Sequence, residues 1–161
     1  MPRSDSVPEQ DALRKVESGP TFEVWQLRAS SMRLDWSRAG VVELTLSGHG
    51  YAEFVPPSLR RWNESLLTCE RLTLLIDFWD MPGNESQLRL GMTDWALEHR
   101  TRLEPIHILT RSPLVRMGVT VANIALGGLI QVHAMRATYD SALKAPGVRD
   151  GRASNRRSPR R

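Results

Sequence analysis

The sequence is poor in several residues on which common protein functions depend. It contains a single cysteine, Cys69, so no disulfide can form within the chain, and this favours a reducing compartment. It has only two tyrosines and three phenylalanines, and only two of its 22 basic residues are lysines. Because arginine is enriched along the whole chain, we interpret the enrichment as a bias of composition rather than as a binding site. Cys69 itself lies where we expect a small core residue.

Long apolar runs are also missing. The longest uncharged stretch, residues 117–132, is interrupted by Gly127 and Gly128, and it is shorter than the roughly 20 residues that span a bilayer. The first 15 residues are polar, whereas a secretory signal requires an apolar segment. The sequence therefore predicts a cytoplasmic protein without a transmembrane segment.

The familiar catalytic and nucleotide-binding motifs are missing as well. There is no P-loop, no GxGxxG after a strand, no HExxH, no CxxC and no GxSxG, so we expect no catalytic residue, no cofactor and no enzyme activity. The four histidines are scattered, and His107 and His133 fall inside apolar segments where packing is more common than metal binding. We expect no metal site. An enzyme would require His99 or His107 to meet Asp77 or Asp80 in one cleft.

The net positive charge of the chain comes from its last residues. The net charge is +4, but residues 147–161 hold six arginines and one aspartate, so the remainder is close to neutral. This end segment has almost no apolar residue that could offset its ordering entropy, and we predict a disordered Arg-rich tail over residues 146–161. It would bind anions weakly and without specificity. We expect no specific nucleic-acid binding.

From residue 71 to residue 143 the sequence alternates three times between apolar strand segments and amphipathic helices. The strands are expected at TLLIDF, PIHILT and LIQVHA, and the helices at about 86–103, 113–126 and 136–144. Strict alternation of this kind predicts an α/β fold, because parallel strands need crossover helices between them.

The preceding part predicts strands and one helix. Alternating apolar residues indicate strands at residues 22–27, 32–37 and 41–48, the last two forming an antiparallel hairpin, and a helix at residues 58–69. We expect residues 1–20 to be a disordered tail with a transient helix at about 10–16. The prediction is thus one domain, residues 21–145, with a mixed sheet in which an antiparallel hairpin precedes βαβαβα and the helices pack on the sheet.

The helix at residues 113–126 is apolar on nearly all sides. We expect one face to pack on the sheet, and Val121 and Ala125 to lie nearer the margin. The packed face consists of Val115, Val119, Ala122 and Leu126. Together with Arg116, the marginal residues form a candidate surface for a partner or an apolar ligand.

The loop from Asp77 to Ser86 is the other candidate site, because it follows a central strand and enters a helix. Ligand and partner sites gather at this edge of sheets with parallel strands. Asp77 and Asp80 could present paired carboxylates, Asn84 is a candidate helix cap, and Ser86 would place a hydroxyl at the start of the helix, where a phosphate is stabilised.

This pattern, with the strings LLIDF, VRMGVTVANIALGG and TYDSAL, resembles the STAS domains of anti-anti-sigma factors, and is most similar to their SpoIIAA-like branch. That branch is related in architecture to CRAL-TRIO lipid-transfer domains. The resemblance covers about residues 21–145. It implies a STAS-like fold in which Ser86 occupies the place of the serine that such proteins phosphorylate, although the usual neighbours of that serine are replaced here by GNESQ.

The resemblance further implies a non-enzymatic, regulatory module that binds a protein, with a homodimer as one form of that interaction. The alternative is a carrier of a lipid or another apolar small molecule, whose cavity would be lined mostly by apolar groups. The residues alone do not decide between these two functions.

Overall fold

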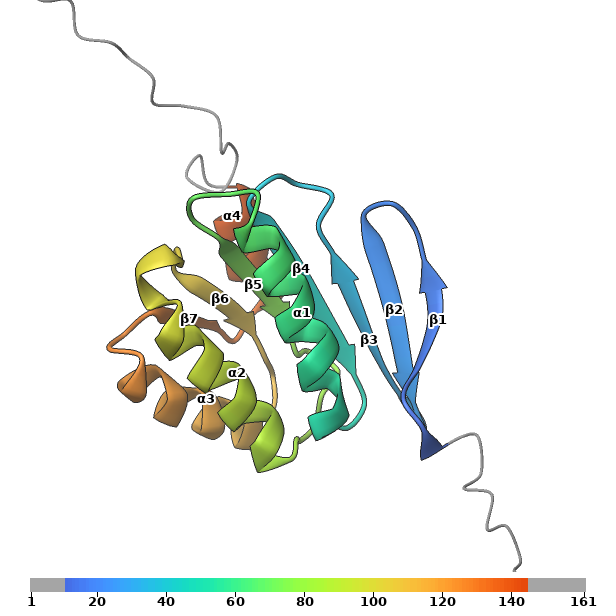
Figure 1. Ribbon diagram of the computed structural model, residues 1–161. Helices are drawn as coiled ribbons and strands as arrows, with labels where there is room; N and C mark the ends of the chain where they lie inside the picture. Colours follow the sequence, from blue (N-terminus) through green and yellow to red (C-terminus); the bar gives the residue numbers. More distant parts are fainter. Residues whose placement is uncertain (1–10, 145–161) are drawn as a thin grey trace, which may run out of the picture.

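The sheet carries its seven strands in the order in which they occur in the sequence. The computed structural model describes residues 11–144. Four strands form an antiparallel meander: β1 (Arg14–Ser18), β2 (Phe22–Leu27), β3 (Ser30–Asp35) and β4 (Val41–Ser47). Beyond β4, the strands β5 (Thr73–Asp77), β6 (Ile106–Leu109) and β7 (Ile130–His133) are parallel. The mixed α/β sheet predicted from the sequence is confirmed, with a larger antiparallel part than the predicted hairpin (Figure 1).

The expectation that residues 1–20 form a tail with a transient helix is wrong where the structure describes them, because residues 14–18 form the edge strand β1. All five side chains of β1 are exposed, and its sequence, RKVES, does not alternate between apolar and polar residues. It is held by backbone pairing with β2 and by Lys15, whose Nζ lies 3.0 Å from a Glu23 carboxylate oxygen. Residues 1–10 and the predicted tail at 146–161 lie outside the described residues.

Three helices cover one face of the sheet and one helix covers the other (Figure 1). The first group is α1 (Val55–Leu66), α2 (Ser86–Glu98) and α3 (Pro113–Ala125), and α4 (Arg136–Lys144) lies on the opposite face. Each helix lies within a few residues of its predicted position. α1 begins three residues early because Pro56 and Pro57 are accommodated in its first turn, where no intrahelical N–H bond is lost.

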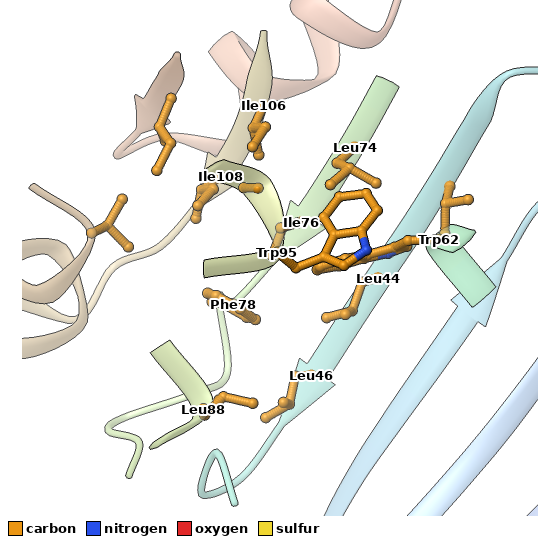
Figure 2. Packing of buried hydrophobic residues seen from close by; sticks show 14 of the residues in the cluster. Leu44, Leu46, Trp62, Leu74, Ile76, Phe78, Leu88, Trp95, Ile106 and Ile108 are labelled. Atoms are coloured by element: carbon orange, nitrogen blue, oxygen red, sulfur yellow. The ribbon is translucent and has the colours of Figure 1, made fainter. Parts of the chain in front are cut away.

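The main core lies between the sheet and the three helices. Leu44 and Leu46 of β4 and Leu74 and Ile76 of β5 point into this layer (Figure 2). There the rings of Trp62 on α1 and Trp95 on α2 meet with 5.0 Å between their centroids. The first four residues of β5 are buried because helices cover both faces of the sheet at this strand.

A second, smaller cluster lies beneath α4. It joins Val41, Leu75 and Leu109 of the sheet to Tyr139 of α4, and Trp79 and Leu143 pack against it. Within the described residues, α4 is the one helix on this face, so the cluster depends on α4 for its cover.

Candidate functional site

The structure holds Asp77, at the end of β5, apart from Asp80 in the loop that follows. One oxygen of Asp77 accepts a hydrogen bond from the backbone N–H of Trp79 at 2.9 Å, and the other accepts one from Arg136 of α4, also at 2.9 Å. Asp80 is paired instead with Arg111, at 2.9 Å. Each carboxylate therefore serves a different arginine, and the two do not form a joint acid–base pair.

The ring of Trp79 contacts the arginines of both ion pairs. The guanidinium groups of Arg111 and Arg136 lie 5.5 and 5.6 Å from the centre of its ring, within cation–π range. Arg111 also donates to the Trp79 carbonyl at 2.9 Å. A solvent-open hollow at this edge is lined by Trp79, Asp80, Met81, Pro82, Arg111 and Ser112. Its charges are already matched within the chain, so it offers no surplus charge to a ligand.

The expectation that Asn84 caps the helix is wrong. The residue at the cap position of α2 is Glu85, without a side-chain capping bond. The backbone of Asn84 instead forms a parallel bridge with Gly50, and its amide donates to the Glu85 carbonyl at 2.9 Å. The Glu85 carboxylate accepts from the Ala52 N–H at 2.8 Å. Pairing with the segment after β4 thus takes Asn84 out of capping geometry.

Ser86 is the first residue of α2, and it is exposed. A phosphate there would gain from the helix dipole. It would also lie beside the Glu85 carboxylate, which repels added negative charge.

The helix α3 has a well-defined start. Ser112 accepts a hydrogen bond from the Val115 N–H at 3.3 Å and donates to the Pro82 carbonyl at 2.9 Å. Pro113 follows in the first turn. These contacts fix α3 to the loop after β5, so the two candidate sites meet at this point.

The two faces of α3 differ sharply in burial. The face predicted to pack on the sheet is confirmed, since Val115, Val119, Ala122 and Leu126 are at most 7% exposed. Val121 and Ala125 are exposed, as expected for marginal positions. A set of large apolar side chains, spaced at three and four residues, faces solvent and is called here the α3 stripe. It consists of Leu114 (60% exposed), Met117 (63%), Val121 (54%) and Ile124 (77%).

The chain segment that contains α3 has no acidic residue. Between Glu104 and Asp140 there is neither aspartate nor glutamate, and Arg116 of α3 is exposed, while Arg111 and Arg136 are paired with Asp80 and Asp77. Asn123, which the sequence places among the polar residues of α3, is tied to β7 by two hydrogen bonds with the Ile130 backbone, at 2.7 and 2.9 Å. The exposed surface of α3 is therefore apolar and basic.

An apolar cavity of about 70 Å³ lies between α2, α3 and the sheet. Its lining is mainly aliphatic and aromatic, and its polar contributors are Asn84, Arg89 and Thr93. The aliphatic part of Arg89 lies over Gly118, since a Cβ there would be 3.2 Å from Arg89 Cδ. Arg89 thus packs across the junction of α2 and α3.

On the other face of the sheet lie two histidines that are far apart in the sequence but in contact in the structure. Nδ1 of His107 on β6 and Nε2 of His133 on β7 are 3.1 Å apart, and the two rings are stacked. Tyr139 of α4 meets the His133 ring edge-on at 5.7 Å. The parallel pairing of PIHILT with LIQVHA is the signal that would have placed both side chains on one face.

Burial lowers the pKa of both histidines, and the neighbouring His133 lowers the pKa of His107 further. Burial also raises the pKa of Tyr139 far above that of a free tyrosine, with Asp77 and Glu43 adding to the effect. These groups are thus held in their neutral forms near pH 7.

The geometry proposed for an enzyme is not assembled by the described residues. His107 contacts His133 rather than Asp77, and His99 lies at the end of α2, with Nδ1 2.9 Å from the Trp95 carbonyl oxygen. Among residues 11–144, no group of three or more histidine, cysteine or acidic side chains is arranged to hold a metal ion. In the same part of the chain, no helix has the length and apolar character needed to cross a membrane.

Comparisons with known proteins identify the fold. Searches of protein-family models and of curated proteins found no match. Among solved structures, an uncharacterized protein of the DUF3478 family with a SpoIIAA-like fold, from Shewanella loihica PV-4, is similar with a TM-score of 0.52. The two sequences are 16% identical, and the similarity covers 73% of this chain and 96% of the other. The SpoIIAA-like fold implied by the sequence resemblance is confirmed.

Proposed function

We propose that this STAS-like chain is a non-enzymatic binding module, and that it contacts a protein partner through the α3 stripe. The observation that carries the proposal is the exposure of four large apolar side chains on one helix whose opposite face is fully packed. Contiguous apolar patches are uncommon on the surfaces of folded soluble proteins, and where they occur they usually mark interaction sites. Scattered single apolar residues would carry no such weight.

The charge around the stripe defines the kind of partner. Arg116 lies exposed on α3 itself, and no acidic residue occurs from 105 to 139. Arg111, which precedes the helix, is already paired with Asp80. A matching surface would have an apolar centre and an acidic rim, because complementary charges speed encounter and suppress wrong partners. The protein would then have a regulatory role if different partners competed for this surface.

Site-specific photo-crosslinking tests the proposal. A benzophenone amino acid is placed at Ile124 in the stripe, and at Ser141 on the opposite face as the matched control, in cells that naturally contain the protein. We expect one discrete protein adduct from position 124 and none from 141. The partner identified in this way should bind the purified wild type and lose at least tenfold in affinity for Val121→Asp, a change of about 1.4 kcal/mol. Equal crosslinking at both positions would contradict the proposal.

A carrier of an apolar small molecule is a second candidate, favoured by the cavity between α2 and α3. Its volume of about 70 Å³ is roughly half that of the 150 Å³ cavity known to bind benzene. A lipid would fit only if α2 and α3 moved apart, and for this reason we place the carrier second. Native mass spectrometry of the purified protein distinguishes the two, because a carrier would retain a ligand of defined mass.

A further inference from the structure

The contacts of α4 with the sheet are concentrated around the two stacked histidines, called here the histidine pair. α4 packs on β6 and β7, the strands that carry His107 and His133. Its buried anchor, Tyr139, is 5% exposed and meets the His133 ring. His107 is itself only 8% exposed. His107 is therefore buried beneath α4, while His133 is partly exposed at the edge of the contact.

The distance between the two nitrogens limits the protonation states of the pair. At 3.1 Å, one ring nitrogen donates its proton and the other must accept it. A second proton in this gap would place two N–H groups face to face and two positive charges on stacked rings. The contact is thus compatible with two neutral imidazoles, or with one charged and one neutral, and is broken when both are charged.

The two acidic side chains of the sheet that act on Tyr139 are already paired with arginines. Asp77 of β5 is held by Arg136 of α4, and Glu43 of β4 pairs with Arg38. α4 also carries Lys144 and Asp140. Asp140 forms no ion pair within residues 11–144, but it is not among the groups that shift the pKa of either histidine. No carboxylate raises the pKa of either histidine, and burial lowers both.

We propose that the histidine pair makes the docking of α4 dependent on pH, so that acid releases α4 from the sheet. With α4 docked, the histidines bind protons less readily than they would in water. Docking is then fully favoured above about pH 6.5, the ordinary histidine pKa, and weakens as the pH falls below it. Release would uncover the apolar cluster of Val41, Leu75 and Leu109 and provide a second, conditional contact surface.

Hydrogen exchange of the full chain measures this directly. Between about pH 7.5 and pH 5.5, after correction for intrinsic exchange rates, we expect the protection of α4 amides to fall by roughly tenfold for one titrating histidine, and by more for two. The amides of α2 are the internal reference and should keep their protection. A uniform loss over both helices, or none in α4, would overturn the proposal.

Two variants make the test specific. His107→Asn combined with His133→Gln removes the titration while retaining polar side chains, and should abolish the pH response of α4. His49→Asn, at an exposed histidine outside the pair, should preserve it. If the double variant does not fold, the NMR titration of the wild-type imidazoles decides: both pKa values must lie below about 6.5, and values at or above it would refute the proposal.

Discussion

Asn63 on α1 accepts a hydrogen bond from the indole N–H of Trp95 on α2, with 2.7 Å between Oδ1 and Nε1. This bond joins two helices whose tryptophan rings also pack on each other. Asn63→Ala should lower the free energy of unfolding by about 1 kcal/mol, the usual net value of one hydrogen bond, because water can reach the exposed Asn63 position. Urea denaturation followed by tryptophan fluorescence measures the change.

A double-mutant cycle provides the control for this bond. Trp95→Phe removes the donor, so the further change Asn63→Ala should cost much less in that background than in the wild type. Equal costs in both backgrounds would show that Asn63 contributes through some other contact.

Aspartate substitutions at two adjacent residues of α3 should differ strongly in their effect on stability. Ala122 is 6% exposed and Val121 is 54% exposed. Ala122→Asp buries a carboxylate without a partner and should cost more than about 3 kcal/mol, a large part of the stability of a domain. Val121→Asp should change stability by no more than about 0.5 kcal/mol. Thermal melts and size-exclusion profiles of the two variants test this, and a folded, monodisperse Ala122→Asp protein would contradict the packing of α3.

Glu23 is expected to make stability fall in acid. Its side chain is 3% exposed and lies 3.0 Å from Lys15 and 2.8 Å from Arg60. Burial raises its pKa, but the contacts with Lys15 and Arg60 outweigh this, and the pKa lies below the ordinary 4.5. The neighbouring Trp25 indole acts in the same direction, although its Nε1 is not placed for a hydrogen bond by strict geometry.

Because the pKa of Glu23 is lower in the folded state, its contribution is fully present above the unfolded-state pKa and is lost as the pH falls toward the folded value. Glu23→Gln should therefore be less stable than the wild type near pH 7, and the difference should shrink below about pH 4. Denaturation curves at a series of pH values measure this. A difference that does not depend on pH would mean that the charge of Glu23 is unimportant.

Gly50 should tolerate no larger residue. A Cβ there would lie 2.6 Å from Leu88 Cδ2 and 2.7 Å from Asn84 Cβ. Leu88 is buried, and Asn84 Cβ is attached directly to the backbone. Gly50→Ala is expected to cost about 1–3 kcal/mol through overpacking. Gly83→Ala is the matched control in the neighbouring loop after β5. The Gly83 carbonyl accepts from the Gly50 N–H, and a Cβ at Gly83 would have its nearest neighbour at 3.6 Å, an ordinary contact. Equal effects of the two changes on the melting temperature would argue against this close approach.

The sequence predicted those parts of the fold that bury apolar side chains with a regular period. The helix α3 and the strand β5 were placed correctly, as was the packed face of Val115 and Ala122, because burial imposes the period that the sequence displays. β1 was missed because its stability comes from backbone pairing and from the contacts of Lys15, which leave no apolar pattern.

The candidate site was harder to predict, because its geometry depends on distant segments. Asn84 has the right chemistry for a cap, but the bridge to Gly50 places it elsewhere. His107 and His133 are 26 residues apart in the chain and meet only through the register of β6 and β7. Local propensity contains no information on such contacts, and the exposed stripe of α3 becomes visible only when the buried face is known.

The strictly sequential order of the sheet also bears on how the protein forms. Each strand pairs with the strand synthesised just before it, so no strand waits for a distant partner, and loop closure between neighbours costs comparatively little entropy. The antiparallel meander can assemble while the rest of the chain is still being made, and each later strand and helix then extends an existing template. β7 and α4 are the last of the described elements to be made, so the histidine contact between β6 and β7 and its cover by α4 form only after the other six strands have been synthesised.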